Sequence, residues 1–160
     1  MPSEMLLSAL IKETVKAFFI MILITLLLVP TMTIVDALLG QRSYGVLDPH
    51  VYTPDHPFIM AFFLSLSCTV SALAEELFFR GFLYNALKSR LSVVTAAGIQ
   101  ALVFAFAHPY SISGKLLLFF MGIALVIVYE KSKNLLTPIL VHGFWNALGA
   151  VAFHLFRTIM

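Results

Sequence analysis

Charge is scarce in this sequence. Asp, Glu, Lys and Arg make up only 11% of the 160 residues, while 61% are hydrophobic. A soluble domain typically carries about 25% charged residues, so this composition excludes an ordinary water-facing surface and predicts an integral membrane protein. One domain is expected at this length, because about five spans of about 20 residues each would use nearly the whole chain.

Cysteine and basic clusters are scarce too. Cys68 is the only cysteine, which excludes an intramolecular disulfide, and its position in an apolar run is typical of a small core residue. The formal net charge is +2, and the basic residues are too scattered to form the stripe with interleaved aromatic side chains that is typical of nucleic-acid binding. No nucleic acid is therefore expected as a partner.

Long apolar runs are what the sequence has in abundance. They predict an all-α integral membrane bundle of about five transmembrane helices, at residues 17–39, 58–87, 91–107, 116–129 and 135–156. Within a single domain over residues 1–160, an N-terminal extra helix at about 10–39 precedes a core at about 58–156. The Gly- and Pro-rich segment 40–57 is predicted to be a loop. The first run is predicted to be a retained anchor, because it is long and no small-residue cleavage site follows it.

The basic residues of the predicted turns indicate an orientation. With a cytoplasmic N-terminus, one side of the membrane receives most of the lysines and arginines, namely Lys12, Lys16, Lys88, Arg90, Lys131 and Lys133. The opposite side receives only Arg42, Lys115 and Arg157. Because cytoplasmic loops carry an excess of Lys and Arg, the N-terminus is predicted to be cytoplasmic, in a membrane expected to be the prokaryotic cytoplasmic membrane.

Two adjacent carboxylates and an arginine interrupt the second apolar run, in the stretch "AEELFFRGFL" from Ala74 to Leu83. Ionisable groups at membrane depth are unfavourable and usually functional. Glu76 and Arg80 are four residues apart on a predicted helix, so they are placed to pair. Glu75 points about 100° away from Glu76 and must find another partner or hold a proton. Alternatively, both glutamates only lock helices together.

His108 offers that partner. Glu75 and His108 lie at similar distances before and after the predicted turn at Leu91, so an antiparallel helix pair brings them to similar depth. Phe104 is one turn before His108 and could wall the imidazole off from lipid. A carboxylate and an imidazole that meet in this way can activate water. Alone, a histidine beside Pro109 would instead be an ordinary loop residue.

A second histidine pattern lies in the last run. His142 and Asn146 are four residues apart, which places an imidazole and a carboxamide on one helix face. Two converging hydrogen-bond donors in a dry site can stabilise an oxyanion, although such residues also form interhelical hydrogen bonds in membranes. One carboxylate and two histidines, Glu75, His108 and His142, could alternatively bind a catalytic zinc. We expect no metal, because Asn146 is a poor zinc ligand that shares a face with His142.

Three motifs follow in order: "EELFFR" from Glu75 to Arg80, "FAFAH" from Phe104 to His108, and "HGFWN" from His142 to Asn146. They read as EExxxR, FxxxH and HxxxN. In this order they resemble the CPBP family of CAAX-protease and bacteriocin-processing intramembrane endopeptidases, also called Abi or type II CAAX-protease-like proteins. The short chain is similar to a myxosortase-like member, and the resemblance covers about residues 71–148.

The resemblance implies a glutamate-type protease. It implies that Glu75 and His108 activate water, that His142 and Asn146 form the oxyanion hole, and that Glu76 and Arg80 support the site or contact substrate. The implied substrate is a membrane-anchored or lipidated protein or peptide: a prenylated CAAX protein, a pheromone or bacteriocin, or a C-terminal sorting signal.

The chain departs from the family in length, because it is shorter than the eight-span members. Either it is a minimal core enzyme, or a partner chain or a second copy completes the cavity. Two other functions stay open. One is a non-catalytic immunity or scaffold protein of the same fold, and the other is a small proton-coupled transporter, for which the absence of an internal repeat is unfavourable.

Overall fold

The computed structural model describes residues 3–38, 40, 59, 62 and 65–159, and its elements are all helical. In chain order they are α1 (Ser3–Leu38), η1 (Ser67–Ser71), α4 (Ala72–Glu76), η2 (Leu77–Tyr84), α5 (Asn85–Lys88), α6 (Val93–Phe106), α7 (Ile112–Ser132) and α8 (Leu136–Ile159). The predicted all-α class is therefore confirmed for the described part of the chain. The predicted loop at 40–57 lies almost wholly outside the described residues.

The second predicted run is one helical path with two wide turns in it. Its junction residues Ala72, Leu77 and Asn85 all keep right-handed helical dihedrals, so η1, α4, η2 and α5 follow one another without a break. η1 and η2 are π-helical, a geometry that is frequent at functional sites. Counting this path once, the described residues form five helices, as predicted.

Side-chain caps mark the starts of α6 and α8, and a residue with left-handed backbone dihedrals marks the end of α7. The Ser92 hydroxyl accepts a hydrogen bond from the Thr95 backbone N–H at 3.1 Å and starts α6. The Asn134 side chain accepts from the Thr137 N–H at 2.8 Å at the start of α8. Such caps satisfy N–H groups that have no partner within the helix. Lys133, with a φ of 54°, ends α7 in the left-handed conformation.

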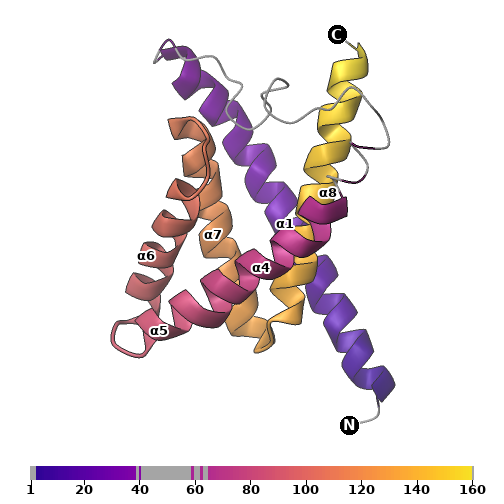
Figure 1. Ribbon diagram of the computed structural model, residues 1–160, viewed down its shortest axis with the longest axis vertical. Helices are drawn as coiled ribbons and strands as arrows, with labels where there is room; N and C mark the ends of the chain where they lie inside the picture. Colours follow the sequence, from indigo (N-terminus) through magenta and orange to yellow (C-terminus); the bar gives the residue numbers. More distant parts are fainter. Residues whose placement is uncertain (1–2, 39, 41–58, 60–61, 63–64, 160) are drawn as a thin grey trace.

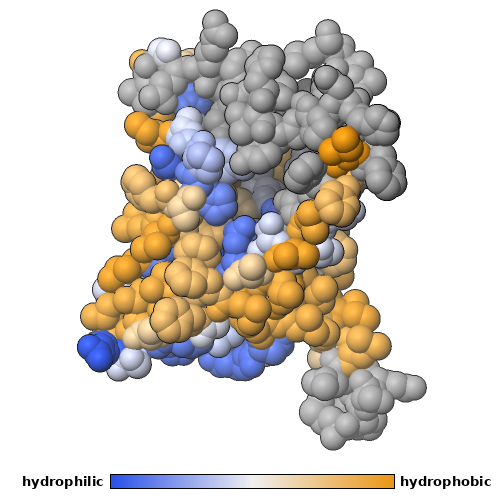
Figure 2. All heavy atoms as spheres, viewed as in Figure 1, coloured by the Kyte–Doolittle hydropathy of each residue, from blue (hydrophilic) through white to orange (hydrophobic). Residues whose placement is uncertain are grey.

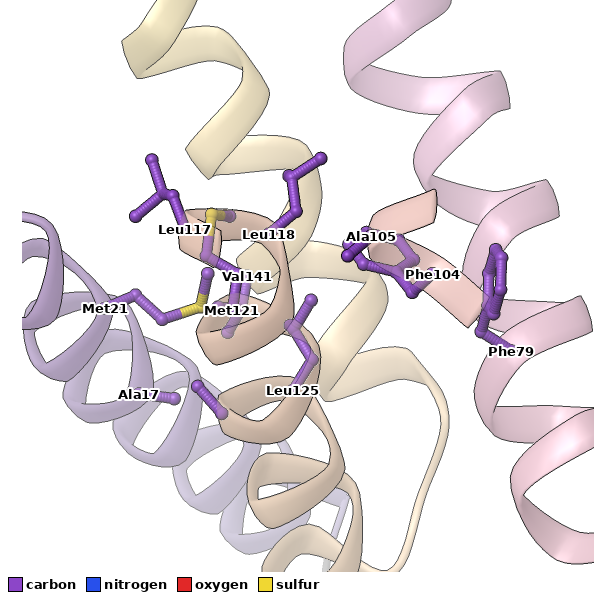
Figure 3. Packing of buried hydrophobic residues seen from close by; sticks show 11 residues of the cluster. Ala17, Met21, Phe79, Phe104, Ala105, Leu117, Leu118, Met121, Leu125 and Val141 are labelled. Carbon is purple, nitrogen blue, oxygen red and sulfur yellow. The ribbon is translucent and has the colours of Figure 1, made fainter. Parts of the chain in front are cut away.

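The helices pack around one apolar core that supports the centre of the molecule. α6 and α7 form an antiparallel pair, α8 runs back beside α7, and α1 crosses them diagonally (Figure 1). The buried cluster joins Met21 of α1, Met121 and Leu125 of α7, Phe104 of α6 and Val141 of α8, as Figure 3 shows. Close packing of these side chains holds the helices against one another.

The first helix is longer at its N-terminus than predicted. We predicted a helix from about residue 10, but α1 begins at Ser3. Leu7, Ser8 and Ala9 are exposed, and one face of α1 packs on the bundle only from about Thr14 onward, where Thr14, Ala17 and Met21 are buried. At the other end of α1, the Asp36 carboxylate is 2% exposed and accepts a hydrogen bond from the Ser113 hydroxyl at 2.7 Å.

Two described helices are long and apolar enough to cross a membrane. They are Leu7–Leu38 of α1 and Ile112–Ser132 of α7. The apolar helices Val93–Phe106 and Leu136–Ala152 are shorter; the 14 residues of α6 span about 21 Å, against a hydrocarbon core of about 30 Å. Length and composition alone thus qualify two of the five helices as spans.

Gly143 lets α8 approach η1 closely, and this contact yields a prediction. A Cβ atom at Gly143 would lie 2.4 Å from the carbonyl oxygen of Cys68, so Gly143→Ala must push the two helices apart. We expect a loss of about 1–3 kcal/mol in the free energy of unfolding, measured by thermal unfolding in detergent. The control is Gly149→Ala in the same helix, where nothing lies within 4 Å of the added Cβ. Equal melting temperatures for the two variants would contradict the contact.

Candidate active site

Four helical segments deliver the side chains of the candidate site. Glu75 and Glu76 are on α4, Arg80 follows on η2, His108 is two residues after the end of α6, and His142 is in α8. α4 packs against α8, and η2 packs against α6. These packings bring the EExxxR residues together with Phe104, His108 and His142, although Glu76 and His142 are 66 residues apart in the sequence.

A buried ion pair forms the base of the site. Arg80 Nη1 donates to Glu76 Oε1 at 2.7 Å, and both side chains are 0% exposed. Arg80 Nη2 also donates to the Gly122 carbonyl oxygen at 3.2 Å. The same Glu76 Oε1 lies 2.8 Å from Nδ1 of His142. Glu76 thus joins the arginine of its own helical path to a histidine of α8.

Glu75 faces both histidines. Its Oε2 lies 3.7 Å from Nε2 of His108 and 3.8 Å from Nε2 of His142. Both distances are longer than a direct hydrogen bond. The side chain of Glu75 is 26% exposed and that of His108 is 23% exposed, whereas His142 is 5% exposed. The carboxylate therefore lies where the buried network opens outward.

Hydrogen bonds fix which imidazole nitrogen faces Glu75. Nδ1 of His108 lies 2.8 Å from the Phe104 carbonyl oxygen, which can only accept, so this Nδ1 carries a hydrogen. Nδ1 of His142 faces the arginine-paired carboxylate of Glu76, and it carries a hydrogen for the same reason. In the neutral state, both Nε2 atoms then present lone pairs toward Glu75. Three acceptor atoms converge, which explains why no direct hydrogen bond joins them.

Phe104 is the apolar wall between these groups. It is 1% exposed, and its ring centroid lies 4.9 Å from that of His108 and 6.0 Å from that of His142. The guanidinium of Arg80 stacks over the same ring, 4.9 Å from the centroid. Phe79 closes the far side in an edge contact (Figure 3). One aromatic ring thus packs against the guanidinium of the ion pair and lies beside both imidazoles.

Asn146 lies one turn beyond His142 on α8 and is half-buried. It therefore shares a helix face with His142, as its spacing predicts. Figure 2 shows hydrophilic residues reaching into the middle of an otherwise apolar face. The site thus combines a carboxylate, two oriented imidazoles and a nearby carboxamide within an apolar molecule.

Glu75, His108 and His142 are also the three residues that the sequence offers as alternative zinc ligands. Zinc bonds to nitrogen and oxygen of about 2.0–2.1 Å place the ligand atoms of a tetrahedral site about 3.4 Å apart. The two histidine nitrogens lie farther than that from Glu75 Oε2, at 3.7 and 3.8 Å. Within the described residues, no group of three His, Cys, Asp or Glu is arranged to hold a metal ion.

Three features of the site had no signal, or only a weak one, in the sequence. We paired Glu76 with Arg80 alone, whereas Glu76 also binds His142, because the crossing of α4 and α8 is not encoded in any local spacing. Arg80 also donates to the backbone carbonyl oxygen of Gly122, and no residue pattern in the sequence predicts a backbone acceptor. Tyr110 stacks on His108 with centroids 5.9 Å apart, and its position two residues after the histidine was the only hint.

The comparisons with known proteins agree with the motifs. The family model described as type II CAAX prenyl endopeptidase Rce1-like matches residues 57–148, more than half of the 160 residues, and this range contains all three motifs. No curated protein and no solved structure matches the chain. The match extends from before α4 to the middle of α8, and so includes every residue of the site. The chain belongs to the type II CAAX prenyl endopeptidase Rce1-like family.

Proposed function

We propose that the chain is an intramembrane endopeptidase of the glutamate type, which hydrolyses a peptide bond of a membrane-anchored or lipidated protein or peptide. Membership of a CAAX endopeptidase family supports protease activity. The observation that carries the mechanism is the approach of Glu75 Oε2 to Nε2 of both His108 and His142, at 3.7 and 3.8 Å.

Membrane embedding is supported by the surface and by the family. Large apolar side chains are exposed at many of the described positions of α1 between Leu7 and Leu38. Such an apolar surface suits lipid and is unfavourable in water. The family is membrane-embedded. The turns that carry Lys88, Lys131 and Lys133 lie at the end of the molecule where α1 begins (Figure 1), which suits a prokaryotic cytoplasmic membrane with the N-terminus in the cytoplasm.

We assign the activation of water to Glu75 and His108. Two hydrogen bonds of about 2.8 Å reach across up to about 5.6 Å, so one water molecule can donate to Glu75 Oε2 and to His108 Nε2, which are 3.7 Å apart. Its lone pairs then face away from both acceptors, toward a scissile carbonyl carbon. As the oxygen attacks, one proton passes to Glu75, which can later deliver it to the leaving amine.

His142 and Asn146 are proposed to stabilise the oxyanion. Because Nδ1 of His142 donates to Glu76, its Nε2 can donate to an oxyanion only when the ring is an imidazolium. By accepting from Nδ1, the Glu76 carboxylate sets which nitrogen of His142 faces the substrate carbonyl. Glu76 thereby acts as a positioning residue for His142. No metal is needed for these steps.

Asn146→Ala tests this assignment. In the purified full chain, reconstituted in lipid vesicles, cleavage of an N-terminally labelled prenylated peptide with a C-terminal CAAX sequence is followed by mass spectrometry. Loss of one oxyanion donor is expected to lower kcat about 10²–10³-fold with little change in KM. The control is Asn134→Ala, which removes the helix cap at the start of α8. A rate for Asn146→Ala equal to that of the control would contradict an oxyanion role.

A further inference from the structure

A groove between α1 and α7 lies outside the candidate active site. It has a volume of about 330 Å³ and is lined by apolar side chains of α1 between Ala17 and Leu28 and of α7 between Phe120 and Val128. The residues Glu75, His108 and His142 are not among its lining. Three charged residues line it as well: Glu13 and Lys16 at the start of the α1 stretch, and Lys131 at the end of the α7 stretch.

The length of the groove matches one leaflet of a bilayer. From Lys16 to Leu28, α1 advances about 18 Å, and half of the hydrocarbon core of a membrane is about 15 Å thick. The charged residues lie at one end, because α1 and α7 run in opposite directions (Figure 1). This is the end at which the basic turns gather. A lipid chain in the groove would therefore have its headgroup beside Lys16 and Lys131.

The charged residues of the groove also indicate which kind of lipid headgroup it can bind. Two lysines and one glutamate give the lining a net charge of +1. A phosphodiester carries one negative charge and can bind both ammonium groups, which leaves the carboxylate of Glu13 to accept hydrogen bonds from headgroup hydroxyls. A phosphatidylglycerol molecule supplies both groups and makes the lining neutral. A choline headgroup supplies no hydroxyl donor.

We propose that the groove between α1 and α7 binds one phosphatidylglycerol molecule, with an acyl chain along the groove and the phosphate between Lys16 and Lys131. The inference rests on the membrane location proposed above and not on catalysis. Ala17, Met21 and Ala124 belong both to the groove lining and to the buried core. Bound lipid would therefore fasten α1 to the bundle and raise the thermal stability of the whole chain.

Native mass spectrometry of the detergent-purified full chain tests this binding. Equimolar phosphatidylglycerol and phosphatidylcholine are added to wild type, to the double variant Lys16→Gln/Lys131→Gln, and to a control with the same charge loss, Lys12→Gln/Arg90→Gln, whose residues do not line this groove. Wild type and control are expected to prefer phosphatidylglycerol at least about tenfold. The groove variant is expected to lose this preference and the accompanying rise in melting temperature.

Three outcomes would overturn the proposal. The first is that wild type shows no preference for phosphatidylglycerol, and the second is that the control variant loses the preference as much as the groove variant does. The third outcome is that a second copy of the chain or a prenylated peptide occupies the groove in place of the lipid. A steric variant, Ile127→Trp, adds a second readout, because it fills the groove without changing charge and is expected to abolish binding of the acyl chain. The same measurement on Glu75→Gln separates the two proposals. If Glu75→Gln keeps the lipid preference but cleaves like wild type, the protease proposal alone is contradicted. If Glu75→Gln loses cleavage as expected while wild type shows no preference for phosphatidylglycerol, the lipid site alone is contradicted.

Discussion

Glu75→Gln is expected to lower the rate of peptide cleavage by at least about 10²-fold while the helical fold is retained. The amide has nearly the shape of the carboxylate but cannot take a proton from water. Because Glu75 Oε2 has no direct hydrogen bond to lose, stability should change little. The measurement is kcat for the labelled prenylated peptide in vesicles, together with the melting temperature.

The matched control is Glu4→Gln, which makes the same chemical change in the first turn of α1. This variant should cleave the labelled peptide at the wild-type rate. A non-catalytic immunity or scaffold protein of the same fold would show no difference between the two variants. A loss of cleavage that simply follows a loss of folded protein would count against the assignment as well. The contrast between kcat and melting temperature therefore decides whether Glu75 acts chemically.

Arg80→Met is expected to destabilise the protein by about 3–5 kcal/mol. Arg80 and Glu76 are both 0% exposed and bonded at 2.7 Å, so the substitution leaves a carboxylate buried without its main cation. Thermal unfolding in detergent measures the effect. The exposed Arg90→Met is the control for loss of a positive charge and should unfold near the wild-type temperature.

A double variant separates the ion pair from packing. In Glu76→Gln/Arg80→Met the buried charge is removed with its partner, and replacing both members of a buried pair is often nearly neutral. The amide oxygen that Glu76→Gln introduces can still accept from Nδ1 of His142. We expect the double variant to be more stable than Arg80→Met alone. If the double variant is the less stable of the two, the buried charge is not the cause of the loss.

Much of the fold follows from local patterns in the sequence. The apolar runs predicted the number of helices, and the polar stretches near Leu91 and Lys133 predicted where the chain turns, because exposed turns need side chains that cap helix ends. The spacing of Glu76 and Arg80 predicted a pair that is present in the structure. The first helix is predicted from about residue 10, whereas α1 begins at Ser3, because the apolar pattern used to place it does not extend to these early residues although they are compatible with helix.

The parts of the site that the sequence did not predict depend on how helices cross. Glu76 and His142 are 66 residues apart, and their contact depends on the packing of α4 against α8. The π-helical turns of η1 and η2 have no residue pattern that distinguishes them from α-helix. The depth argument placed Glu75 opposite His108 but did not show that His142 faces the same carboxylate oxygen.

The most direct test compares protein termini in native membranes from cells that carry the wild-type chain with those that carry Glu75→Gln, at matched protein levels. Proteolysis by this chain predicts a defined set of new termini that is present with wild type and missing with Glu75→Gln, and the lost cleavage sites then identify the substrates. Identical termini in the two membranes, with the variant folded and present in equal amount, would contradict the protease and assign the polar cluster to binding or transport.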